Sequence, residues 1–225
     1  MLYVYALVDA RPIPPSPEGD GHGGAPLCVV ARGSVAAVCS RHEHIEMPVE
    51  PDHLWRHEHV AERLMDEHAV LPVRFGTTVA DEDALAAMLD DREDEFRGAF
   101  ERVRGRVELG VRVLWTPPEN EPEAAPDGTG PGRAYLLGRL AARNAATSLA
   151  ESIHAGLAAR AAEARYEVSA TPRLLLSAAY LVDRGDVGAF LEAVDEATRR
   201  HPEVELLCTG PWPAHTFAES VGELR

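Results

Sequence analysis

Apolar positions along the chain follow two periods, and together these predict a mixture of strands and helices. Short or alternating apolar runs indicate strands, and the sequence has them at 2–10, 27–32, 34–40, 70–79, 106–115, 174–183 and 204–208. Apolar residues spaced three or four apart indicate helices, and these occur at about 52–69, 81–104, 133–166 and 187–198. We therefore expect an α+β protein.

The run VLPVRFGTTV at residues 70–79 is the central feature of the first half, and we expect it to form one strand that closes near Gly76. Strand alternation places Leu71 and Phe75 on one face and Arg74 on the other. Pro72 has no backbone N–H to donate to a neighbouring strand, which favours an edge or strand-entry position over the middle of a sheet.

One segment divides the chain in two. Residues 116–132, TPPENEPEAAPDGTGPG, are rich in proline, glycine and acid with almost no apolar side chain, which is typical of a linker. We expect an N-terminal α+β domain over 1–115 and a C-terminal domain over 133–225. The C-terminal domain begins with a long alanine-rich helix, and its strand–helix–strand continuation suggests a ferredoxin-like sheet with helices on one face.

Charge limits the classes of partner. The chain has 22 basic residues, all arginine, and 37 acidic ones, for a formal net charge of −15. Such a charge argues against nucleic acid and anionic membrane surfaces as partners. The sequence also lacks an apolar run of membrane-spanning length and a recognisable N-terminal targeting segment. We therefore expect a cytoplasmic protein.

Histidine and cysteine are the candidate metal ligands. His53 and His57 are four residues apart, which is the spacing of zinc ligands on a helix. The HExxH pattern fails because Ala61 stands where its second histidine is required. His57 lies on the helix face expected to be buried, so we predict an imidazole hydrogen-bonded to backbone, with a metalloenzyme as the less favoured alternative. The three cysteines, Cys28, Cys39 and Cys208, form no C-x-x-C pair and indicate plain thiols in a reducing compartment.

Other motifs of catalysis and nucleotide binding fail in context. GDGHGG at residues 19–24 matches G-x-G-x-x-G, but a proline-rich segment precedes it and Pro26 follows. A dinucleotide site needs this motif to leave a strand and open a helix. The sequence has no G-x-S-x-G elbow and no P-loop. We therefore expect neither an enzyme nor a bound cofactor or metal.

Several motifs in order along nearly the whole chain resemble the gas vesicle protein F/L family (GvpF/GvpL). They are MLYVYALV at the start, His57 followed by VLPVRFGTTV, GRAYLL at 132–137, YLVD at 180–183 and the GPWP tail. The sequence departs from the family pattern at Thr78 and in the tail, where Ala214, His215 and Thr216 follow GPWP. The residues assigned to a structural scaffold on this resemblance are His57, Leu71, Pro72, Arg74, Phe75, Gly76, Gly210, Pro211, Trp212 and Pro213.

The resemblance implies a non-enzymatic accessory protein of gas vesicles, which are intracellular gas-filled compartments with a protein wall. It implies two α+β domains, the second a modified ferredoxin-like fold with added helices. It also implies an assembly factor or minor wall component that contacts the hydrophobic shell subunit and other gas vesicle accessory proteins. We expect the partner surface on the long helix after Gly132 or on the strand with Phe75. The candidate partner-binding residues on the long helix are Leu136, Leu140, Leu149, Ile153 and Leu157.

Besides the less favoured metalloenzyme built on His53 and His57, two hypotheses of function remain before the structure is considered. In the first, the protein holds shell subunits, whose amphipathic helices would otherwise aggregate, and passes them to the growing wall. In the second, it is a regulatory module that binds a small molecule, an alternative that rests only on analogy with other ferredoxin-like sheets.

Overall fold

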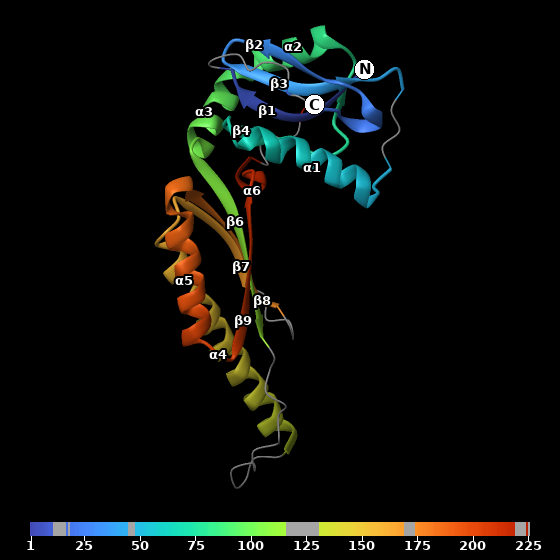
Figure 1. Ribbon diagram of the computed structural model, residues 1–225. Coiled ribbons are helices and arrows are strands. Elements are labelled where there is room, and N and C mark those ends of the chain that lie inside the picture. Colours follow the sequence, from blue (N-terminus) through green and yellow to red (C-terminus); the bar gives the residue numbers. More distant parts are fainter. Residues whose placement is uncertain are drawn as a thin grey trace. The chain divides into compact units, whose positions relative to one another are not determined.

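The computed structural model describes residues 1–10, 17, 19–44, 48–115, 131–168, 174–218 and 224, and it contains two compact units (Figure 1). Unit 1 consists of Met1–Val107 together with Trp212–Arg225, and unit 2 of Glu108–Pro211. Each unit has its own β-sheet and its own cluster of buried apolar side chains. The expected α+β class is confirmed.

The sheet of unit 1 has the strand order β2-β3-β1-β4, and β5 also pairs with β1. Its strands are β1 (Leu2–Asp9), β2 (Leu27–Arg32), β3 (Val35–Arg41), β4 (Val70–Pro72) and β5 (Thr78–Val79). The predicted first strand and the hairpin that follows it are confirmed, with β2 and β3 antiparallel. β1 lies between β3 and β4, so its side chains form the middle of the unit 1 core.

The run at residues 70–79 is two strands, so the prediction of one continuous strand was wrong. Both β4 and β5 pair with β1, but in different registers, because residues 74–76 loop out between them. The Val73 N–H still donates to the Tyr5 carbonyl oxygen, and the Thr77 carbonyl oxygen accepts from the Val4 N–H. Gly76 has a positive φ of 84°, which glycine adopts without steric cost. Arg74 is exposed on this loop. The edge position that Pro72 predicted is confirmed, since β4 ends the strand order.

The helices of unit 1 are α1 (Pro51–Met65), α2 (Glu82–Asp91), α3 (Glu93–Val103) and the short α6 (His215–Ala218), with a 3-10 turn, η1, at His22–Gly24. All four of these helices carry buried apolar side chains.

The ends of these helices differ in part from the expected ones. Asp81 caps α2 as predicted, because its carboxylate accepts a hydrogen bond from the Ala84 N–H at 2.9 Å. Asp52, expected to cap α1, lies in its first turn after Pro51. The single helix expected over 81–104 is broken at Arg92, so that the acidic residues 93–95 occupy the first turn of α3, where the helix dipole favours negative charge.

Unit 2 contains the ferredoxin-like βαββαβ order, and its sheet has the strand order β7-β8-β6-β9. The elements are β6 (Arg106–Trp115), α4 (Pro131–Ala158), β7 (Glu163–Val168), β8 (Leu174–Asp183), α5 (Val187–Arg200) and β9 (Val204–Trp212), with a 3-10 turn, η2, at Arg184–Asp186. This fold confirms the expected ferredoxin-like character of the C-terminal half.

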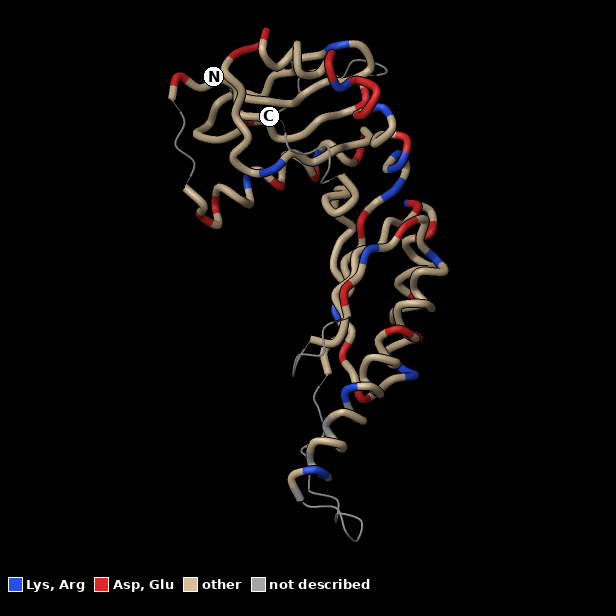
Figure 2. Tube along the Cα trace, turned by 180° about the vertical axis from the view of Figure 1, so that it is seen from behind, with Lys and Arg blue, Asp and Glu red and all other residues tan. Residues whose placement is uncertain are grey.

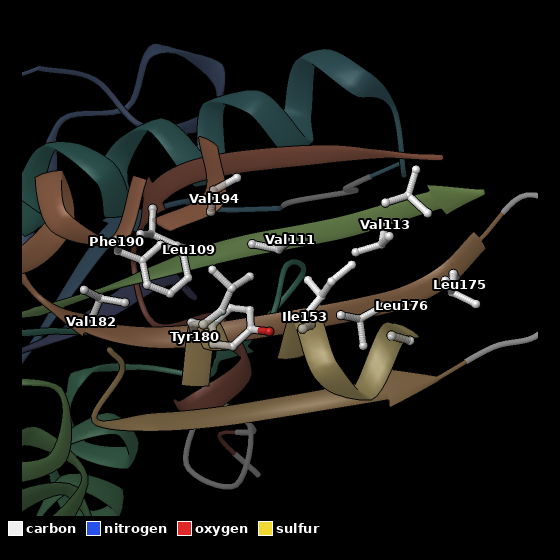
Figure 3. Close-up of a cluster of buried hydrophobic side chains, with 14 of the residues drawn as sticks. Leu109, Val111, Val113, Ile153, Leu175, Leu176, Tyr180, Val182, Phe190 and Val194 are labelled. Carbon is white, nitrogen blue, oxygen red and sulfur yellow. The ribbon is translucent and has the colours of Figure 1, made fainter. Parts of the chain in front are cut away.

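The core of unit 2 lies between the sheet and its two long helices. Figure 3 shows side chains from β6, β8, α4 and α5 converging there: Leu109, Val111, Val113, Ile153, Leu175, Leu176, Tyr180, Val182, Phe190 and Val194. On β6 the core residues are every second one, because alternate side chains of a strand point to the same face. The intervening Arg112 is exposed.

The structure divides the chain differently from the predicted boundaries. β6, expected in the N-terminal domain, is a strand of the unit 2 sheet, and the tail from Trp212 belongs to unit 1. The helix expected over 133–166 ends at Ala158, and the unpredicted strand β7 follows it. Most of the predicted linker, residues 116–130, lies outside the described residues, while Pro131 and Gly132 already belong to α4.

Candidate functional site

A cluster of aromatic and histidine rings surrounds the loop between β4 and β5 in unit 1. This tyrosine–histidine cluster consists of Tyr3, Tyr5, His22, His57 and Phe75, whose ring centroids lie 4.7 to 6.4 Å from their neighbours. Both tyrosines come from β1, while the other three rings come from η1, α1 and the loop. The cluster therefore joins segments that are far apart in sequence.

His57 is the hydrogen-bonding centre of this cluster. Its Nε2 lies 2.8 Å from the Val73 carbonyl oxygen, which can only accept, so Nε2 carries the proton. In a neutral ring Nδ1 then accepts from the Tyr3 hydroxyl at 2.9 Å, and the same hydroxyl accepts from the Gly76 N–H at 3.1 Å. Burial lowers the pKa of His57, which favours this neutral form. The imidazole is buried and bonded to backbone, as predicted.

His22 belongs to the glycine-rich segment that was discounted as a nucleotide site, and the structure gives that segment a packing role. The His22 backbone N–H donates to the Tyr5 hydroxyl at 2.7 Å, and that hydroxyl lies 2.8 Å from Ser40 Oγ. A Cβ at Gly21 would overlap with the Tyr5 hydroxyl, so only glycine fits there. No motif or periodicity in the sequence indicates that this loop packs on β1.

The ring of His22 is also buried, at 3% exposure. Among the described residues its Nε2 has no hydrogen-bond partner. Burial, followed by the nearby His57 and His53 rings, lowers the pKa of His22 to about 4. The ring is therefore neutral at physiological pH and packs as an aromatic side chain.

These hydrogen bonds leave the histidine pair poorly suited to bind a metal. Both ring nitrogens of His57 are engaged, and Nδ1 of His53 lies 3.2 Å from the Pro48 carbonyl oxygen. Over the part of the chain that the structure describes, no three His, Cys, Asp or Glu side chains come together as a metal site would require.

The C-terminal tail packs on unit 1. Phe217 is 1% exposed, its helix α6 contacts β4, and its carbonyl oxygen accepts from Arg102 Nη1 at 3.4 Å. His215 Nε2 lies 2.9 Å from Oε2 of Glu58, the neighbour of His57 on α1. Burial alone would raise the pKa of Glu58, but the hydrogen bond and charge of His215 lower it. His215, one of the residues that depart from the family pattern, thus pairs with Glu58.

The predicted scaffold residues fall into these two places. On the loop side, Leu71 and Pro72 are buried, Phe75 is half-buried, and Arg74 and Gly76 are exposed. In the tail, Gly210, Pro211 and Trp212 are exposed, whereas Pro213 is buried. The Gly210–Pro211 peptide bond is cis.

A second feature lies in unit 2, where the first turns of α4 expose three leucines. This leucine ridge consists of Leu136, Leu137 and Leu140, which are 66%, 52% and 53% exposed. Of the other predicted partner-binding residues, Leu149 is half-buried, and the Ile153 and Leu157 side chains are buried in the unit 2 core. The second half of α4 therefore packs on its own sheet, and the large apolar side chains described as exposed on this helix lie in its first half.

The charge around the leucine ridge differs from that of the chain as a whole. Figure 2 shows acidic residues on both units, whereas the first turns of α4 carry none. Residues 131–150 contain three arginines and no aspartate or glutamate, in a chain with 37 acidic residues. The ridge is therefore an apolar surface flanked by positive charge.

Comparison with known proteins gives consistent matches over nearly the full length. The family model described as gas vesicle synthesis protein GvpL/GvpF matches residues 1–219. The chain is 34% identical to gas vesicle protein L of Streptomyces sp. (strain CB03234), with 97% of this chain and 92% of that protein covered. It is 30% identical to gas vesicle protein F of the same strain, with 96% and 99% covered.

The fold is also that of a solved structure. The crystal structure of the gas vesicle protein GvpF from Anabaena sp. PCC7120 superposes with a TM-score of 0.81 at 20% identity, covering 96% of this chain and 95% of that one. Among the described residues of our chain, we find no helix that is both long and apolar enough for a membrane span.

Proposed function

Because this chain belongs to the gas vesicle synthesis protein GvpL/GvpF family and takes part in gas vesicle formation, we propose that it binds the hydrophobic shell subunit during assembly. In this proposal the protein is a non-enzymatic assembly factor or minor wall component that works in the cytoplasm with other gas vesicle proteins. It covers an apolar face of the shell subunit until that subunit joins the wall.

The observation that supports this proposal is the leucine ridge. Three large apolar side chains more than half exposed on two turns of one helix are a surface that a partner can cover. Moving a leucine side chain completely out of water contributes about 1.5–3 kcal/mol to the free energy of association. An amphipathic helix that lies along α4 would bury all three leucines at once.

Charge supports the same arrangement. The arginines at positions 133 and 143 on either side of the ridge favour a partner whose apolar face is bordered by acidic side chains. The net charge of −15 keeps a complex with a hydrophobic subunit from self-associating. The tyrosine–histidine cluster has no part in binding in this proposal; it holds unit 1 together.

The test is co-purification of the full chain with the shell subunit. A Leu136→Gln/Leu140→Gln variant should retain at most about a tenth of wild-type binding, since losing two apolar contacts removes well over 1.4 kcal/mol. The matched control is Leu191→Gln/Leu207→Gln, which changes two leucines of unit 2 that are each 42% exposed but lie outside the ridge. Circular dichroism confirms that both variants are folded.

Two results would contradict the proposal. The first is that the ridge variant and the control capture the shell subunit to the same extent as the wild type. That result would show that another surface binds the subunit. The second is no association of the wild-type protein with the shell subunit, which would exclude the function itself.

The alternative, a small-molecule regulatory module, has one observation in its favour. A groove of about 440 Å³ lies between α4 and α5, lined among others by Arg160, Arg200 and His201, and ligand pockets have volumes in this range. A thermal-shift screen with nucleotides and amino acids tests it. A ligand that raises the melting temperature of the wild type but not of Arg160→Ala would support this second function.

A further inference from the structure

Two of the three cysteines face each other in unit 1. Cys28 on β2 and Cys39 on β3 are direct partners in the antiparallel register, and their Sγ atoms are 3.3 Å apart. Both are free thiols, and the third cysteine, Cys208, lies on β9 in unit 2. The pair is therefore a vicinal dithiol made by the fold, because eleven positions separate the two residues in sequence.

The geometry permits a bond between the two sulfurs. Opposite residues of antiparallel strands have Cα atoms roughly 4.5–5.5 Å apart, which lies within the range of about 4.4–6.8 Å that disulfides span. The sulfur atoms need to approach each other by about 1.2 Å to reach bonding distance. Rotation of the two side chains can supply most of this movement.

We propose that Cys28 and Cys39 form a redox modification site, in which a peroxide-class oxidant converts the dithiol into a cross-strand disulfide. The bond would fix β2 to β3. This matters for β2 because it is the edge strand of its sheet and β3 is its one neighbour in the strand order. An edge strand that opens exposes unpaired backbone groups to other chains. The inference is independent of the function proposed above.

The order of reaction follows from exposure. Cys39 is fully buried, and burial together with the Cys28 hydrogen bond raises the pKa of its thiol, so it is a poor nucleophile toward an oxidant in solvent. Cys28 is half-buried, and we assign it the first step. Its thiolate attacks one peroxide oxygen, the O–O bond breaks, and Cys28 becomes a sulfenic acid while the other oxygen leaves as water.

The second step closes the disulfide. The Cys39 sulfur attacks the sulfenic sulfur, the S–O bond breaks, and the hydroxyl departs as water with the proton of the Cys39 thiol. The two thiols together lose two electrons, and the peroxide accepts them. A thiol reductant reverses the change by exchange.

The experiment treats the reduced, folded full chain with hydrogen peroxide, blocks remaining thiols with iodoacetamide in denaturant, and maps the peptides by mass spectrometry. We expect a crosslinked peptide that joins Cys28 to Cys39, a mass lower by two hydrogens before alkylation, and loss of the crosslink after reduction. Glutathione in a parallel reaction shows that the oxidant dose is sufficient.

Three variants separate this site from other thiol chemistry. Cys208→Ser should form the crosslink like wild type, whereas Cys28→Ser and Cys39→Ser should not. In Cys39→Ser the second step cannot occur, so the sulfenic acid should remain on Cys28. The inference is overturned if both thiols of the folded wild type stay reduced at a dose that oxidises glutathione, or if the crosslink forms only in denaturant. Both of these results come from wild-type protein, so they do not depend on how the variants fold.

Discussion

At the scale of single residues, the structure is organised by contacts between side chains that are distant in sequence. The Tyr3 hydroxyl bonds to His57, 54 positions away, and to the Gly76 N–H, 73 positions away. The helical periodicity around His57 was enough to predict a buried imidazole. The sequence did not identify its partners, because neither period nor propensity records which distant side chains meet. The buried ring of His22 was missed for the same reason.

His22 should make the stability of unit 1 depend on pH. Burial holds its pKa at about 4, below the 6.5 that it has when solvated, so the unfolded chain takes up this proton first as the pH falls. Stability from this residue is therefore complete above about pH 7 and declines as the pH drops below 6.5. At pH 5.8 the loss is about 1 kcal/mol from the linkage relation.

The measurement is urea unfolding at pH 7.5 and pH 5.8 of the wild type and His22→Phe. Phenylalanine keeps an aromatic ring in the cluster but does not titrate, so the variant should lose less stability than the wild type between the two values. Equal losses in the two proteins would show that His22 is not the titrating group, since other buried histidines contribute the same amount to both.

At the scale of elements, the sequence predicted which segments are strands and helices better than where they end. The run at 70–79 has the composition of one strand, but Gly76 allows a loop, and the Tyr3 hydroxyl and Val73 contacts stabilise it. The predicted strands 27–32 and 34–40 leave Gly33 alone in the hairpin turn, so they do not predict the Cys28–Cys39 pairing. A two-residue turn at Gly33 and Ser34 pairs Arg32 with Val35 and hence position 28 with 39, whereas a turn at Gly33 alone shifts the register by one.

Tyr3→Phe tests what holds the loop between β4 and β5. Removing the hydroxyl leaves the Gly76 N–H and Nδ1 of His57 without this partner, and we expect a loss of about 1–3 kcal/mol in the free energy of unfolding. Amide exchange at Gly76 should become faster. The matched control is Tyr166→Phe on β7, whose side chain is 52% exposed and which should change stability by less than about 0.5 kcal/mol. Similar small effects of both substitutions would contradict the role of Tyr3.

At the scale of the whole molecule, the sequence predicted two units but not how the chain is shared between them. The alternating pattern of β6 fits either sheet equally well, and the proline- and glycine-rich segment after it suggested a boundary there. The structure instead places the change from unit 1 to unit 2 at Val107–Glu108, inside this strand. The return of the chain to unit 1 at Trp212 could not be read from a tail of so few apolar residues.

Phe217→Ala tests whether the returning tail stabilises unit 1. Phe217 is 1% exposed, and we expect a loss of about 3–5 kcal/mol, as for other large-to-small changes at buried aromatic positions. Hydrogen exchange followed by mass spectrometry should show faster exchange in β4 and α1. Leu191→Ala, at a 42% exposed position in unit 2, is the control and should leave those segments unchanged. Unaltered exchange in β4 with Phe217→Ala would mean that the tail contributes little to unit 1.

Because unit 1 is assembled from both ends of the described chain, the ribosome has to synthesise all of unit 2 before the segment that completes unit 1 exists. Unit 2 can reach its final topology as soon as β9 has left the exit tunnel. Unit 1 cannot be completed before α6 is synthesised, and the position that Phe217 occupies in its core stays empty until then. Translation therefore imposes an order of completion that is the reverse of the order in which the two sheets begin.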